Sequence, residues 1–86
     1  MRIHTLLQGG EFNGMLVTIL APEAKGEIRV AMSDDITPQG DCPVETYALI
    51  EAKPMPGLGG THLQAAYRWV GSRTSTVSLV DYFVDV

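Results

Sequence analysis

The sequence contains one cysteine, Cys42, and this scarcity excludes two kinds of small scaffold. A single thiol cannot form a disulfide within the chain, and it cannot supply a cysteine-rich zinc site. Long apolar runs are also lacking, since no stretch approaches the roughly 18 residues that a membrane span needs. The N-terminal apolar residues reach the Gly9-Gly10 pair too early for the core of a secretion signal. We therefore expect a soluble protein of the cytoplasm, without a membrane contact.

Basic residues are few, because six Lys and Arg stand against ten Asp and Glu, which gives a net charge of −4. A nucleic-acid module needs a basic stripe that displaces counterions from phosphates, so direct binding to nucleic acid is not expected. Charged residues make up 19% of the chain, below the roughly 25% of typical domains. Two interpretations stay open for this low content: scattered exposed apolar side chains, or an apolar face for a partner or for self-association.

Glycine and proline divide the chain into short apolar stretches, which is typical of a single small all-β domain over residues 1–86. We predict an antiparallel barrel or sandwich of five or six strands, in which Asn13-Gly14 closes an opening hairpin by adopting positive φ. Two segments keep a helical alternative, 45–53 and 76–86, and helix in either would make the class α+β. The predicted strands are residues 2–8, 15–20, 27–32, 45–52, 61–70 and 76–86.

The segment 61–70 is predicted to carry the main core anchors. Its alternation places Leu63, Ala65, Tyr67 and Trp69 on one strand face. Because Trp69 is the largest apolar side chain in the chain, we expect it to nucleate the core together with Tyr67. The apolar segment 76–86 is expected to pair in the sheet or against another subunit.

No catalytic motif is found in the sequence. A Walker loop, a Gly-x-Ser-x-Gly elbow and a His-Glu-x-x-His helix are all absent. The glycines at positions 57, 59 and 60 lack the preceding strand and following helix of a dinucleotide-binding turn. Nothing in the sequence assembles a nucleophile, a base and an orienting group, so we predict neither enzyme activity nor a cofactor.

The histidines and the cysteine carry only weak signals. His4 and His62 could meet across a sheet and bind a metal with one of the aspartates of the 34–42 segment. Because no ligand-spacing motif supports this, two solvent-facing strand histidines are favoured. Cys42 stands next to Asp41, and acidic neighbours raise a thiol pKa, so a half-buried and unreactive thiol is expected.

Three segments are candidate contact regions. The first, 34–42, lies in the longest stretch without periodicity, 33–43, which is acidic. Loops of that length are often functional, although a solvated acidic loop is the simpler interpretation. The second is the Pro- and Gly-rich loop 54–60. The third is at the predicted turn, where the hydroxyls and guanidinium of residues 72–76 suit a phosphate or another small anion, against an ordinary β-turn. The individual candidate residues are Asp34, Asp35, Asp41, Leu58, Ser72, Arg73 and Thr74.

Two short motifs resemble those of a group of small uncharacterised bacteriophage proteins. The first is Gly9-Gly10-Glu11-Phe12-Asn13-Gly14 between two apolar strands, and the second is Tyr67-Arg68-Trp69. The group carries a Gly-Gly-Pro-x-Asp-Gly turn and a Tyr-Arg-aromatic strand, so this chain departs from the pattern at Glu11 and Asn13. The match covers about twenty positions. The resemblance implies a phage setting and a compact β fold, and it supplies no catalytic residues.

The leading functional interpretation is a non-catalytic, phage-encoded binding protein that modulates or inhibits a host protein in the host cytoplasm. An acidic face can compete for the basic, nucleic-acid-facing surfaces of host enzymes. One alternative is a virion accessory or decoration protein that assembles as a homo-oligomer through residues 76–86. A third interpretation is a sponge for a small anionic ligand such as a nucleotide, held by Arg73 and nearby hydroxyls.

Overall fold

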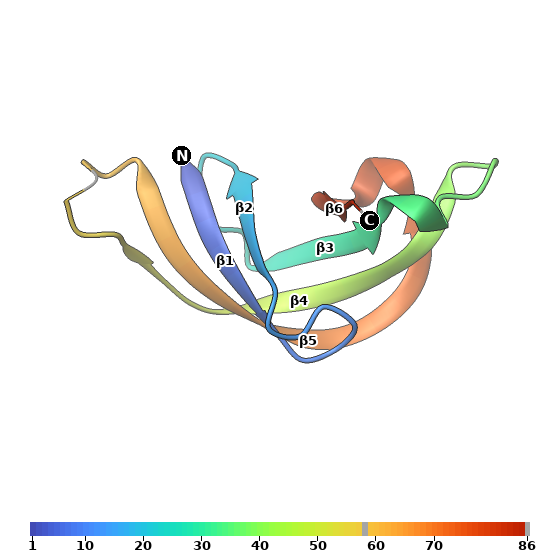
Figure 1. The fold of residues 1–86 in the computed structure, drawn as a ribbon, viewed down its shortest axis with the longest axis horizontal. Helices are drawn as coiled ribbons and strands as arrows, with labels where there is room; N and C mark the ends of the chain where they lie inside the picture. The colour runs from blue at the N-terminus through green and yellow to red at the C-terminus, as the bar shows by residue number, and fades with distance from the viewer. Residues whose placement is uncertain (58, 86) are drawn as a thin grey trace.

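The computed structural model describes residues 1–57 and 59–85, which form one six-stranded mixed sheet curled into a nearly closed barrel (Figure 1). Two short 3₁₀ turns accompany the strands, η1 (Ser33–Asp35) and η2 (Val77–Leu79), and the described ranges contain no α-helix. No helix in them is long and apolar enough to cross a membrane. The all-β class is thereby confirmed. The strands are β1 (Arg2–Gln8), β2 (Leu16–Leu20), β3 (Glu27–Met32), β4 (Asp41–Pro54), β5 (His62–Thr76) and β6 (Tyr82–Val84).

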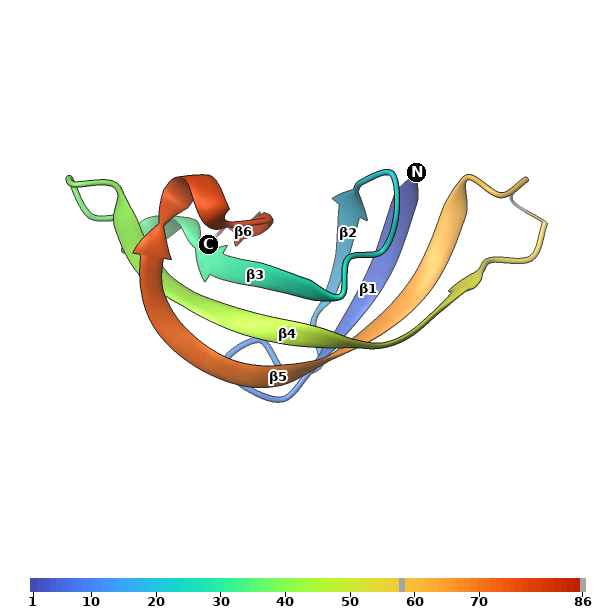
Figure 2. The same ribbon diagram turned by 180° about the vertical axis from the view of Figure 1, so that it is seen from behind.

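The long β4–β5 hairpin forms the middle of the sheet, whose order is β2-β1-β5-β4-β3-β6. Its antiparallel register runs from Asp41 opposite Thr76 to Pro54 opposite Leu63, with two shifts at residues 46–47 and 49–51. Bulges of this kind bend a strand and increase its twist. Figures 1 and 2 show the hairpin curving beneath the other strands, and it accounts for the 44 Å length of the molecule.

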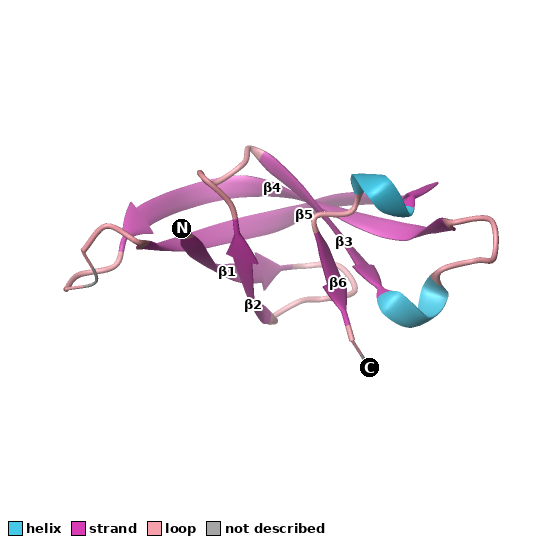
Figure 3. Cartoon of the chain, turned by 90° about the horizontal axis from the view of Figure 1, so that it is seen from above, coloured by secondary structure: helices cyan, strands magenta, loops and turns pink. Residues whose placement is uncertain are grey.

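The remaining strands attach to the hairpin as two separate pairs. β1 and β2 join through β5, whereas β3 and β6 join through β4. Seen from above, the two pairs lie at different positions along the hairpin (Figure 3). The prediction that every strand pair is antiparallel is wrong for two of the pairs: β1 runs parallel to β5, and β6 runs parallel to β3. Turn signals in a sequence reveal hairpins, which are antiparallel, and they carry no information on such distant pairings.

Several predicted boundaries shift because the central hairpin is longer than its apolar stretches. Residues 71–75, predicted as a turn, lie inside β5, and residues 45–53 lie inside β4 rather than in a helix. The segment 76–86 is neither one strand nor an α-helix, since η2 and β6 divide it. The loop predicted at 54–60 forms the tip of the hairpin, and Leu58 lies outside the described residues.

Alternate residues of the strands fill the barrel interior. Tyr47 and Tyr67 are the largest fully buried side chains, so Tyr67 is confirmed as a core anchor. The main cluster combines these rings with aliphatic side chains from β1, β2, β3 and β6. A smaller cluster of Ala31, Cys42 and Val44 lies against η2 and the segment that follows it.

Trp69 lies outside this core, which corrects the prediction that it nucleates the interior. The end of β1 explains the difference. β1 pairs with β5 only as far as Gln8, which lies opposite Arg68, so Trp69 has no β1 residue beside it. The side chain is 41% exposed and covers the glycines that follow β1. A Cβ atom at Gly10 would lie 2.4 Å from Cδ1 of the indole, so that the close contact requires glycine there.

The β1–β2 hairpin is confirmed, although its turn differs from the predicted two-residue reversal. Among the residues that the structure describes, only glycines have positive φ, so Asn13 acts through its side chain, whose Oδ1 accepts the Gly9 N–H at 2.7 Å. Tyr47 of β4 holds the other side of the turn. Its hydroxyl donates to the Gly9 carbonyl at 2.8 Å and accepts the Phe12 N–H at 3.2 Å. These bonds fix Phe12 with its ring buried against the core.

Tyr47→Phe should lower the free energy of unfolding by about 1–3 kcal/mol, because a buried amide and a carbonyl lose their partner. Urea denaturation measures the change. Tyr82→Phe is the matched control, since no hydrogen bond to the Tyr82 hydroxyl occurs among the described residues. Equal losses in both variants would contradict the assigned role of Tyr47.

Gly10→Ala should displace the indole of Trp69 and shift its fluorescence emission to longer wavelength. Trp69 is the single tryptophan of the chain and reports its own environment. Gly14→Ala is the control, since Gly14 also has positive φ, +83° against +66°, but a Cβ there meets no atom within 4 Å. In both variants an alanine at positive φ destabilises the folded state by about 1–2 kcal/mol. An emission shift of the same size in Gly14→Ala would contradict the contact between Gly10 and Trp69.

Candidate binding groove

Two adjoining hollows lie where the barrel fails to close, and together we call them the acidic groove. Their volumes are about 510 and 170 Å³, and they share Glu11, Phe12 and Met32. Small-molecule sites commonly measure about 300–1,000 Å³, and the larger hollow falls within this range while the smaller one lies below it. The larger hollow is also lined by Asn13, Gly14, Met15, Val84 and Asp85, and the smaller by Asp35, Pro43, Glu45 and Ser72.

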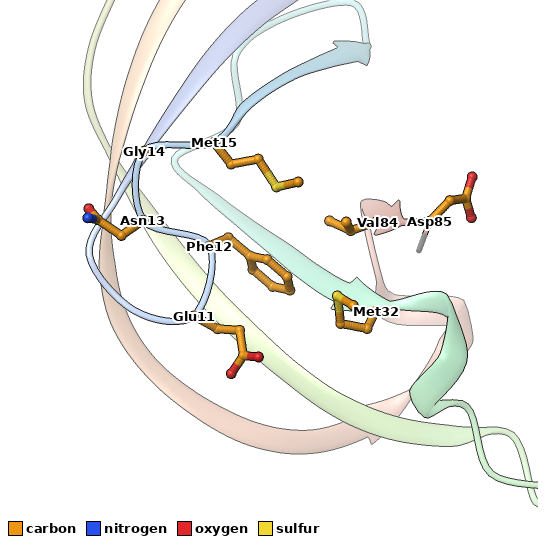
Figure 4. A pocket seen from close by; sticks show the side chains of 8 residues that line it. All are labelled: Glu11, Phe12, Asn13, Gly14, Met15, Met32, Val84 and Asp85. Atoms are coloured by element: carbon orange, nitrogen blue, oxygen red, sulfur yellow. The ribbon is translucent and has the colours of Figure 1, made fainter.

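The groove has an apolar floor built from strand ends. Met15 immediately precedes β2, Met32 is the last residue of β3, and Val84 is the last residue of β6. Figure 4 shows their side chains directed into the hollow, with the Phe12 ring between Met15 and Met32. Methionine is flexible and polarisable, and it adapts to ligands of different shape. The floor therefore suits an inserted apolar side chain.

Carboxylates surround this floor. Glu11, Asp35, Glu45 and Asp85 all line the groove, and none of its lining residues is Lys or Arg. Charges of one sign along a concave surface concentrate the potential there and attract the opposite charge. The groove should therefore favour a cationic or basic ligand and repel an anion.

Of the predicted contact residues, the structure brings Asp35 and Ser72 to the groove. Asp34 is exposed on η1 and Asp41 begins β4, and neither lines the groove. Sequence reasoning missed the apolar floor, because its residues stand singly at the ends of different strands. The only signal for them was the position of Met15 and Met32 at strand boundaries.

The predicted anion site is not assembled. Ser72 and Arg73 line another hollow, of about 230 Å³, whereas Thr74 lies outside it. Glu27 lines the same hollow, and the negative charge of its carboxylate opposes the binding of an anion there. The three residues also lie on a strand rather than on the turn that the anion hypothesis assumed.

The two histidines meet, which corrects the expectation of two separate solvent-facing side chains. Nε2 of His4 lies 2.8 Å from Nδ1 of His62, across the β1–β5 pair. The rings are nearly parallel, at 5°, and their centroids are 5.0 Å apart. That separation fits two coplanar rings joined edge to edge by an N–H···N bond, which needs a neutral ring as acceptor. No group of three potential metal ligands occurs among the described residues, these histidines included.

Cys42 is completely buried in the smaller cluster rather than half-buried. Burial raises the pKa of its thiol, and the charges of Asp41 and Asp35 raise the pKa further. The acidic neighbours thus raise the thiol pKa, as expected from the sequence, and the thiol stays protonated over the neutral range.

Comparison with known proteins yields no relative for this chain: no family model, no curated protein and no solved structure matches it. Its function is therefore argued from the groove and the surrounding surface.

Cys42→Ala should flatten the dependence of stability on pH between about pH 8 and 10. In that window the unfolded chain loses the thiol proton near the ordinary pKa of 9.0, whereas the folded chain keeps it. The free energy of unfolding of the natural chain therefore falls as pH rises toward the raised pKa. The pKa values of Tyr47 and Tyr67 are also raised, from 10.0, so the tyrosines add to the slope in the upper part of the window. Their contribution is present in both the natural chain and Cys42→Ala, so the difference between the two slopes reports the thiol.

Urea denaturation at several pH values measures this slope. Val44→Ala is the matched control, because Val44 is buried in the same cluster and its loss leaves the thiol in place. The control should be less stable at every pH and keep the slope of the natural chain. An unchanged slope in Cys42→Ala would contradict the assignment.

Proposed function

We propose that this chain is a non-catalytic binding protein that holds a segment of a partner protein in the acidic groove. The observation that carries the proposal is the apolar floor enclosed by carboxylates at the opening of the barrel. The complementary segment has an apolar side chain, which fills the floor, flanked by Lys or Arg, which pair with the rim. Burial of the apolar side chain supplies affinity, and the charges supply selectivity and association rate.

A protein partner suits the groove better than a small anion does. The carboxylate rim repels phosphates, which removes the main attraction of a nucleotide. Two hollows side by side also offer room for more than one residue of an extended segment. The sponge for anionic ligands is therefore not favoured.

The biological setting rests on the resemblance to the phage group. In that setting, the groove would occupy a basic surface of a host protein in the host cytoplasm and so modulate or inhibit it. The alternative, a virion accessory protein assembled through residues 76–86, is less favoured. Residues Tyr82–Val84 already pair with β3, and Val80 and Phe83 pack against the smaller cluster, so much of that segment is used within the chain.

A synthetic peptide with a central Leu between lysines should bind the groove, as seen in the methyl resonances of Met15 and Met32. Replacing three rim carboxylates in Glu11→Gln/Asp35→Asn/Asp85→Asn should weaken binding about tenfold, since each lost pair is worth 0.2–1 kcal/mol. The same peptide with glutamates in place of lysines should not bind.

The matched control is Glu23→Gln/Glu27→Gln/Glu51→Gln, which removes the same number of exposed carboxylates from other parts of the surface. At about 0.15 M salt its effect should be less than about twofold, because charges beyond roughly 8 Å are screened. Equal weakening by the two triple variants, or resonance shifts that avoid the groove, would contradict the proposal.

A further inference from the structure

β2 is an edge strand with a free row of backbone groups. Two hydrogen bonds fix which groups face β1: the Leu7 N–H donates to the Met15 carbonyl at 2.9 Å, and the Ala21 N–H donates to the Met1 carbonyl at 3.1 Å. Because the pattern alternates in an antiparallel pair, the odd-numbered residues of β2 bond to β1. Leu16, Thr18 and Leu20 therefore turn their N–H and C=O groups away from the sheet. No strand in the described part of the chain pairs with them.

This edge has none of the features by which proteins usually prevent edge-to-edge association. Charged side chains, proline and bulges protect natural edges, and the five residues of β2 include no charge and no proline. Leu16 and Leu20 are 75% and 74% exposed. Among the described residues, no other large apolar residue is as exposed. The opposite edge differs, because β6 has only three residues and lies between Asp81 and Asp85.

The sequence of β2 is self-complementary about Thr18. Leu16 and Leu20 are equidistant from the centre, and so are the β-branched Val17 and Ile19. A two-fold axis at Thr18 would therefore set like against like, and isologous interfaces require such self-matching.

We propose that β2 pairs antiparallel with β2 of a second copy of this chain, in the register centred on Thr18. In this register Thr18 forms a hydrogen-bonded pair with Thr18 of the partner subunit. Leu16 forms another with Leu20 of the partner subunit, and the reverse pair follows by symmetry. Every free N–H of the edge then finds a carbonyl, and the exposed leucines of both copies meet on one face beside Leu6, which lies opposite Leu16.

The net charge of −4 does not oppose this contact, because β2 itself is uncharged and the charges lie elsewhere on each copy. A contact of five residues on each side is small, so the dimer should be weak and its population should depend on concentration. The inference does not depend on the acidic groove, and failure of peptide binding would leave it unaffected.

Light scattering of two double variants tests the register directly. In Leu16→Lys/Leu20→Lys the proposed register sets like charges against each other, so this variant should be monomeric at all concentrations. In Leu16→Lys/Leu20→Glu it sets opposite charges together, so dimerisation should persist. A parallel pairing in register would set like charges against each other in both variants, so both would be monomeric. A natural chain that stays monomeric up to about 1 mM, or double variants that behave alike, would overturn the proposal.

Hydrogen exchange of the backbone amides supplies a second test, which uses the natural chain and requires no substitution. Protection of the Leu16, Thr18 and Leu20 amides should increase with protein concentration, whereas that of Val17 and Ile19, which bond to β1, should not. Protection of all five amides that is independent of concentration would overturn the proposal as well.

Discussion

Among the strands that the structure describes, the pairing of β4 with β5 is the one ladder that joins the two halves of the sheet. β1 and β2 reach the rest of the molecule through β5, and β3 and β6 reach it through β4. The bend of this hairpin therefore sets how the halves face each other. The acidic groove is a direct result, because its floor takes Phe12 and Met15 from one half and Met32 and Val84 from the other. Tyr47 adds a second link, since its hydroxyl holds the turn of the first half to β4.

Local pattern located most strands, but it did not give all of their bounds and was insufficient for their arrangement. The bounds of β1 and β3 agree with the predicted segments 2–8 and 27–32, where alternation and flanking turns coincide. The length of β5 was underestimated because Gly71 and the polar residues after it imitate a turn. Their backbone groups are nevertheless paired with β4, and this tertiary pairing decides their conformation. The exposure of Trp69 has the same origin, because it depends on where β1, a distant strand, ends.

The groove was harder to predict than the fold. Asp35 and Ser72 were identified as contact residues, on the strength of an acidic stretch and a supposed anion-binding turn, and both do line it. The reasons were incomplete, since Asp35 lies on η1 and Ser72 on β5, and only the tertiary arrangement brings the two to one hollow. The apolar floor gave no sequence pattern, because it consists of one residue from each of several strand ends. Pockets of this kind follow from topology, which alternation within a strand does not encode.

The two parallel pairings have a consequence for how the chain acquires its structure. β1 must find a strand some sixty positions away, and β3 must find β6 some fifty positions away. Loop closure over such separations is slow, and folding rates fall as contacts become less local. The β4–β5 hairpin joins strands that are adjacent in the sequence and can form first, whereas the two parallel pairings that close the barrel follow later. During that interval the uncharged second strand is accessible to other nascent chains, so cellular yield should depend on expression rate and on chaperone supply.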